Sequence, residues 1–166
     1  MVGTWDNKDQ VYGFAALNIV SGQLSTRLLE QPARSQAQTG PSKAQRLQVA
    51  FATHLKDIAQ AYPAHTYPEV VITIDNASWH GGALVRQVLE AHAHLYVKRL
   101  PSYSPQLNVI ERFWRVLRRR ATHNRLFTDM AALRATLRNN ICYFQTMRHK
   151  MLSLIESPRK TKKMQS

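Results

Sequence analysis

The sequence of 166 residues is poor in acidic side chains, with ten Asp and Glu against 23 Lys and Arg. Its formal net charge at pH 7 is therefore +13. This charge favours a polyanionic partner such as nucleic acid, because Lys and Arg displace the counterions that condense on phosphates. A solvated basic surface with no specific partner is the alternative. We favour nucleic acid because the basic residues are clustered along the chain.

Cysteine is almost absent, since Cys142 is the only one. This excludes an intrachain disulfide and agrees with a reducing compartment. The sequence also lacks a signal peptide and any apolar run near the roughly 20 residues that span a bilayer. We find no long helix with one basic and one aromatic face, the pattern that would favour binding to a membrane surface. We expect a soluble, cytoplasmic protein with one domain at residues 1–156 and a basic disordered tail at 157–166.

The hydrophobic pattern predicts the element order β-β-α-β-α-β-α-α. An apolar run at 10–22 followed by 23–30 predicts a hairpin, and the Pro- and Gly-containing stretch 31–45 predicts a loop. Later elements are expected at 42–62 (helix), 69–75 (strand), around 84–89 (helix), 94–100 (strand), from 104 (helix) and 128–144 (helix). For the helix that follows the strand at 94–100, Ser104 is the expected N-cap and Pro105 the first helical residue. Strand–helix–strand–helix from 69 to 121 implies a parallel α/β sheet, whose sites lie beyond the carboxyl ends of its strands.

Two carboxylates stand out in this order. Asp75 ends a buried strand, although an Asp-Asn pair also suits a turn or a helix N-cap. Glu111 is the only acid among many arginines, and a surface pair with Arg115 would contribute only ~0.3–0.5 kcal/mol. At about 100° per residue, Glu111 lies about 60° from Trp114 on the apolar stripe and so borders the buried face. If the two carboxylates meet, a cation must neutralise them, and Mg²⁺ suits such ligands.

The two segments that carry these acids, "VVITIDNASWHGG" and "RLPSYSPQLNVIERFWRVLRRR", closely resemble the DDE endonuclease domain of bacterial insertion-sequence transposases of the mariner superfamily. The spacing of 35 residues between Asp75 and Glu111 lies within the family's narrow range. The resemblance covers roughly residues 8–145, and Val109 departs from it because the family often has Pro there. The matching residues are Asp75, Asn76, His80, Leu100, Pro101, Ser104, Pro105, Leu107, Asn108, Ile110, Glu111 and Trp114.

The resemblance implies an RNase H-like fold, a mixed sheet flanked by helices, and metal-dependent cleavage and transfer of DNA strands. It makes Asp75 and Glu111 catalytic ligands of a two-metal Mg²⁺ or Mn²⁺ site. It implies that Asn76, His80 and Asn108 support the ligands or contact DNA, although a helix-start hydrogen bond explains His80 equally well. Transposon ends and target DNA are the implied partners, in the bacterial nucleoid. The implied phosphate contacts are Lys98, Arg99, Arg112, Arg115, Arg118, Arg119 and Arg120.

The family also needs a third carboxylate, the first Asp of its triad, on a central strand that precedes the hairpin. Only Asp6 and Asp9 lie early in this sequence, and both fit turn residues better. We therefore expect a C-terminal part of a transposase, lacking the first central strand and inactive alone, that needs an upstream fragment or a homodimer. Two origins of such a chain are compatible with the sequence: a decayed gene copy, or the second reading frame of an element that joins two frames by slippage. A non-catalytic DNA-binding remnant and an unrelated basic nucleic-acid-binding protein are the alternatives.

Overall fold

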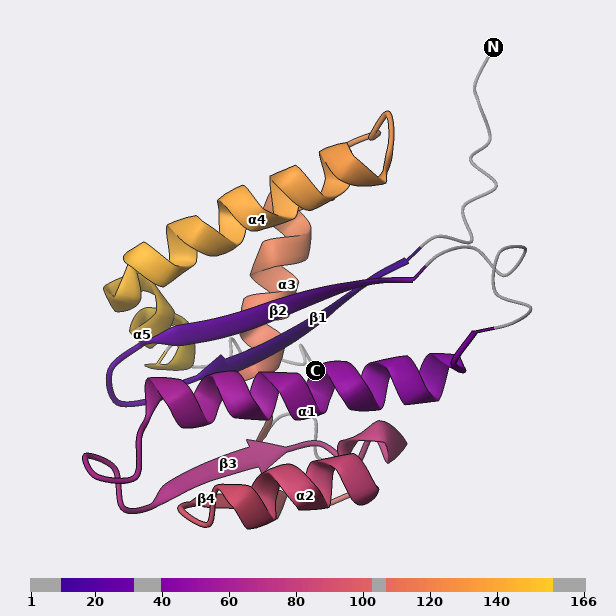
Figure 1. The fold of residues 1–166 in the computed structure, drawn as a ribbon. Helices are drawn as coiled ribbons and strands as arrows, with labels where there is room; N and C mark the ends of the chain where they lie inside the picture. Colours follow the sequence, from indigo (N-terminus) through magenta and orange to yellow (C-terminus); the bar gives the residue numbers. More distant parts are fainter. Residues whose placement is uncertain (1–9, 32–39, 103–106, 157–166) are drawn as a thin grey trace, which may run out of the picture.

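The computed structural model describes residues 10–31, 40–102 and 107–156 (Figure 1). Strands β1 (Gln10–Leu17) and β2 (Leu24–Gln31) form an antiparallel hairpin in which Leu17 pairs with Leu24. Asn18 shapes the turn, because its Oδ1 accepts hydrogen bonds from the backbone N–H of Val20 and Ser21, each at 2.9 Å. The predicted hairpin is confirmed.

Helix α1 (Lys43–Ala61) is the central element of the first core. Ser42 caps it, and a capping box forms because Ser42 Oγ accepts from Gln45 N while Gln45 Oε1 accepts from Ser42 N. The helix predicted at 42–62 is confirmed, and one face of it is buried. Its buried residues are Leu47, Ala50, Phe51, Ala52, His54, Leu55, Ile58 and Ala59.

Strands β3 (Val70–Ile74) and β4 (Leu95–Arg99) pair in parallel, as the sequence predicted. A short 3₁₀ helix, η2 (Ser78–His80), and helix α2 (Ala83–Ala91) make the crossover between them. Among the described residues, β1 and β2 form one sheet of two strands, and β3 and β4 form another. Both sheets pack on α1, with the hairpin on one side and the parallel pair on the other (Figure 1).

Three further helices cover the hairpin from the side away from α1: α3 (Ile110–Ala121), α4 (Met130–Thr146) and α5 (Arg148–Glu156). They enclose a second apolar core with part of β2. Its buried residues are Leu24, Phe113, Leu117, Ala121, Ile141, Phe144 and Met151. None of the described helices has the length and apolar character that crossing a membrane requires.

One expectation about this helical layer is wrong, and one of its helices was not predicted. Helix α3 begins at Ile110 and not near Pro105, because residues 108 and 109 form a turn in which Asn108 O accepts from Glu111 N. Ser104 and Pro105 themselves lie outside the described residues. The helix predicted at 128–144 is confirmed as α4, and α5 is a further helix that follows Met147, whose φ of −94° and ψ of 61° are not helical.

The indole of Trp114 fixes α3 against the hairpin. A Cβ placed on Gly13 of β1 would lie 2.5 Å from Cη2 and 2.8 Å from Cζ3 of that ring. Only glycine allows this approach, so Gly13 and Trp114 together set the distance between β1 and α3. Trp79 also packs, edge-on against Phe14 and Phe51 with ring centroids 5.3 and 5.9 Å away. Both tryptophans pack against the two apolar cores.

Candidate functional site

Asp75 follows the last residue of β3, at the carboxyl end of the parallel pair. Its Oδ1 lies 2.9 Å from Nδ1 of His80 and accepts a hydrogen bond from the backbone N–H of Ala77 at 3.0 Å. Its side chain is still 53% exposed. Asp75 is thus held in a fixed orientation by two donors while the carboxylate remains open to a ligand.

His80 supports Asp75 from within the core. Its ring packs against Phe51 and Trp79, with centroids 4.4 and 3.9 Å away, and burial is the main cause that lowers its pKa. The ring is therefore neutral near pH 7. Because an ionised carboxylate only accepts hydrogen bonds, Nδ1 carries the proton that faces Asp75. The geometry favours a supporting role for His80 over a direct DNA contact, since only 9% of the residue is exposed.

Asn76 joins the ends of the two parallel strands. Its Nδ2 donates to Leu100 O at 2.8 Å, and Leu100 N donates to Ile74 O at 2.8 Å. The guanidinium of Arg99 lies on the same side as η2, since its Nη2 is 3.5 Å from the position of a Cβ on Gly81. Lys98, one residue earlier in β4, faces the other side of the strand pair. Of these two cations, Arg99 is therefore the one near Gly81 and His80.

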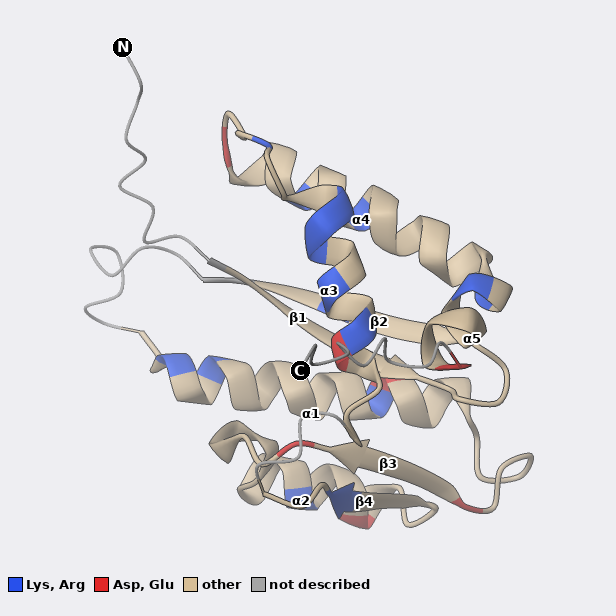
Figure 2. Cartoon of the chain, turned by 180° about the vertical axis from the view of Figure 1, so that it is seen from behind, with Lys and Arg blue, Asp and Glu red and all other residues tan. Residues whose placement is uncertain are grey.

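Glu111 lies in the first turn of α3 and is half-buried. At about 100° per residue, Arg115 and Arg118 lie within roughly 40° and 20° of Glu111 around the axis, and Arg119 within roughly 80°. These three arginines are exposed and make no side-chain hydrogen bond or ion pair with the described residues. Lys and Arg recur along α3 in Figure 2. Glu111 therefore begins a row of cations that are accessible to phosphates.

The other two predicted arginines of α3 contact protein. Arg112 Nη1 donates to the backbone oxygens of Leu154, at 2.9 Å, and Ile155, near the end of α5. The guanidinium of Arg120 lies 4.4 Å from the ring centroid of Tyr143 on α4. The sequence alone groups both with the DNA contacts, because its pattern neither predicts α5 nor places α4 against α3. We leave Arg112 out of the DNA contacts proposed below.

The sequence predicts that Asp75 and Glu111 come together at a shared metal site. No hydrogen bond joins them, and the described part of the chain contains no group of three His, Cys, Asp or Glu that could hold a metal ion. Asp6 and Asp9 lie outside the described residues. Asn108 supplies only its backbone oxygen to the start of α3. The described residues thus offer two separately held carboxylates.

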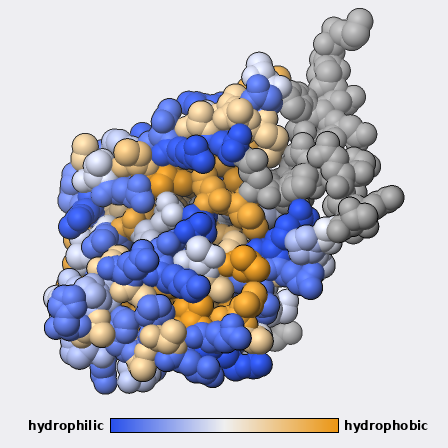
Figure 3. Space-filling model, viewed as in Figure 1, coloured by the Kyte–Doolittle hydropathy of each residue, from blue (hydrophilic) through white to orange (hydrophobic). Residues whose placement is uncertain are grey.

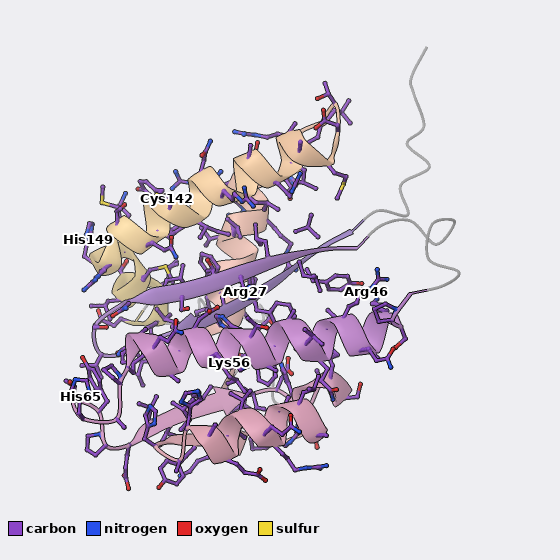
Figure 4. All side chains as sticks on the ribbon, viewed as in Figure 1. Arg27, Arg46, Lys56, His65, Cys142 and His149 are labelled. Atoms are coloured by element: carbon purple, nitrogen blue, oxygen red, sulfur yellow. The ribbon has the colours of Figure 1, made fainter. Side chains whose placement is uncertain are left out.

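A pocket of about 310 Å³, which the sequence pattern does not predict, lies between β2 and the first half of α1. The pocket lies beside a bidentate ion pair in which Arg27 of β2 donates to Asp57 of α1 at 2.7–3.0 Å. Figure 4 shows Arg27 and Arg46 pointing from these two elements, and Figure 3 shows apolar surface on the same face of the molecule. No acidic side chain lines this pocket, so it is separate from the carboxylate site. The lining residues are Arg27, Leu28, Leu29, Pro41, Gln45, Arg46, Val49, Ala50 and Thr53.

The mixed α/β structure, with one acid at the end of a parallel strand and another on a basic helix, has an RNase H-like fold. The structure is similar to the catalytic domain of Mos1 mariner transposase, with a TM-score of 0.53 and 16% identity over 88% of this chain and 78% of that one. A structure of the Mos1 transposase catalytic domain with raltegravir and Mg gives a TM-score of 0.54 and 16% identity, over 89% and 79% of the two chains. At this identity, the likeness concerns the fold.

A family model described as DDE superfamily endonuclease matches residues 42–134, more than half of the chain. The chain belongs to this family. The match includes Asp75 and Glu111, and the predicted fold class is confirmed. A search of curated protein sequences finds no significant match.

Proposed function

We propose that this chain is the catalytic domain of a transposase that cuts and joins DNA strands with divalent metal ions. The observation that carries the proposal is the arrangement of Asp75, held at the end of β3 by His80 and by the N–H of Ala77. The family description, endonuclease, and the Mg in the Mos1 structure support the same chemistry. Bound metal ions would activate the attacking hydroxyl and stabilise the leaving oxygen.

The two carboxylates fit Mg²⁺, which proteins usually hold by one or two carboxylates, with waters and phosphates as the other ligands. Within the described residues, Oδ2 of Asp75 and both oxygens of Glu111 have no hydrogen-bond partner. His80 keeps Asp75 oriented, and Arg115 and Arg118 stand on the same side of α3 as Glu111. A phosphate bound at the carboxylates would therefore meet cations further along the helix.

We further propose that catalysis needs a third carboxylate from a strand between β1 and β3. Parallel pairs are normally parts of larger, covered sheets, and a two-stranded sheet is marginally stable by itself. Among the described residues, β1 pairs only with β2, and β3 only with β4. Phe14 of β1 and Ile74 of β3 nevertheless share one core with α1, so a strand between them would complete a single sheet. Residues 1–9, an upstream segment or a second chain are the candidate sources.

A titration with Mn²⁺ tests the shared metal site. We expect paramagnetic broadening of NMR signals around both Asp75 and Glu111, with weak affinity because the set of ligands is incomplete. Asp75→Asn and Glu111→Gln should each abolish broadening at both places. Glu90→Gln on α2 is the matched control and should change nothing. Broadening around Glu111 that survives Asp75→Asn would rule out a shared site.

Binding of duplex DNA tests the row of arginines. The log of the binding constant should fall linearly with log salt, with a slope near −0.9 per phosphate contact. Replacing Arg115 and Arg118 with Ala should reduce the magnitude of that slope by the equivalent of up to about two phosphate contacts. Arg86→Ala on α2 removes an exposed arginine elsewhere and is the control. An unchanged slope in the double variant would contradict the phosphate contacts.

Cleavage assays separate a catalytic domain from the alternative, a DNA-binding remnant. We expect no Mg²⁺-dependent nicking of DNA by residues 1–166 alone. Adding the segment encoded upstream, in cis or as a separate fragment, should raise the melting temperature and restore nicking that Asp75→Ala abolishes. Nicking by residues 1–166 alone that depends on Asp75 would refute the need for an added strand. DNA binding with no cleavage after the addition would favour the remnant.

A further inference from the structure

Three side chains from the helices α3, α4 and α5 meet at one aromatic ring: Arg120, Tyr143 and Lys150. Lys150 Nζ donates a hydrogen bond to the Tyr143 hydroxyl and lies 4.9 Å from the centroid of its ring. The Arg120 guanidinium lies 4.4 Å from the same centroid and 5.5 Å from that of Phe144. The buried ring of Phe144 therefore helps to hold Arg120 in place.

These two cations share one aromatic ring without a nearby acid. Neither Arg120 nor Lys150 forms an ion pair with an Asp or Glu among the described residues. From residue 110 to 156 the chain has ten Lys and Arg but only three Asp and Glu, which are Glu111, Asp129 and Glu156. Both cations lie within about 5 Å of the centroid of the Tyr143 ring, and an anion bound near both would relieve the repulsion between these like charges.

The cluster cannot act on the phosphates next to Glu111. Arg120 is nine residues after Glu111, which at about 100° per residue places it roughly 180° away around α3. The row of Arg115 and Arg118 faces the other side of the helix. An anion bound by Arg120 therefore lies across the roughly 10–12 Å diameter of α3 from the carboxylate.

We propose that Arg120, Tyr143 and Lys150 form a phosphate site on a second DNA-binding surface, on the side of α3 opposite Glu111. Its occupant is a backbone phosphate of duplex DNA, bound by the two cations and the phenolic hydroxyl. This inference rests on the proposed function, because it assumes that the protein binds DNA. It adds that one chain contacts DNA on two sides of α3.

Fluorine NMR of protein that carries 3-fluorotyrosine provides a local readout. The protein has six tyrosines, and Tyr143→Phe identifies the resonance of Tyr143 by its loss. We expect a short DNA duplex to shift that resonance in the wild-type protein. The shift should persist in the Arg115→Ala, Arg118→Ala double variant, because the second surface is independent of the first.

Matched variants test the same site by affinity. Tyr143→Phe keeps the ring that stacks on Arg120, and Lys150→Ala leaves the α3–α4 contact intact, so both should fold. Each should weaken duplex binding, and Lys150→Ala should reduce the salt slope by about one contact. Lys56→Ala on α1 removes an exposed lysine elsewhere and should leave both the slope and the Tyr143 resonance unchanged.

The outcomes separate the two proposals. A Tyr143 resonance that does not move while the wild-type protein is saturated with duplex overturns the second surface and leaves the proposed function intact. An equal shift caused by inorganic phosphate at the same phosphate concentration also overturns it, because the site then takes any small phosphate. Absence of duplex binding by the wild-type protein refutes both proposals.

Discussion

Gly13→Ala should destabilise the protein by steric overlap with Trp114. The new Cβ would lie 2.5 Å from Cη2 of a ring that also contacts the second core, so the ring or β1 must move. Overpacking of this kind typically costs about 1–3 kcal/mol, partly offset by about 0.4–1 kcal/mol from the lower entropy of the unfolded chain. We expect a net loss of about 1–2 kcal/mol, or roughly 2–8 °C in melting temperature.

Urea unfolding and thermal melts measure this loss, and Gly40→Ala is the control. A Cβ on Gly40 meets no atom within 4 Å, so that variant should match the wild type or be slightly more stable. Trp114→Phe removes the ring atoms nearest Gly13, so Gly13→Ala should cost much less in that background. Equal costs in the two backgrounds, or no cost in the wild type, would show that the close approach does not set the β1–α3 distance.

Two further predictions concern the contacts of α1. Burial lowers the pKa of His54 from 6.5 to about 4. As the pH falls, the unfolded chain therefore binds a proton at this histidine before the folded protein does. Roughly 3 kcal/mol of stability that is present above pH 6.5 is lost as the pH falls towards 4. His54→Leu should flatten this dependence in urea titrations between pH 7 and 5, whereas His65→Gln, at an exposed site, should not. The Arg27–Asp57 pair is about one third exposed, so a double-mutant cycle with Arg27→Met and Asp57→Asn should give a coupling of only about 0.5–1 kcal/mol that weakens with salt. A coupling well above that range would mean that solvent does not screen the pair.

The sequence predicted those parts of the structure that depend on neighbouring residues. Helix α1 carries its start signal locally, in the capping box at Ser42, and the apolar stripe that follows marks the face that is buried. The parallel pair was predictable because a short apolar strand, a crossover helix and a second strand allow few other arrangements. The same periodicities predicted that Asp75 lies at the end of β3 and that Glu111 lies at the edge of the buried face of α3.

Tertiary structure decided what each polar side chain contacts. The sequence could not distinguish a helix-start hydrogen bond of His80 from support of Asp75, because that depends on the burial of the ring against Phe51. Nor could it separate Arg112 and Arg120, which contact other helices, from Arg115, Arg118 and Arg119 of the same helix. Arg112 binds the end of α5, 42 residues further along the chain, and Arg120 stacks on α4. Helical periodicity gives the direction in which a side chain leaves its own helix, but only packing determines which distant element lies there.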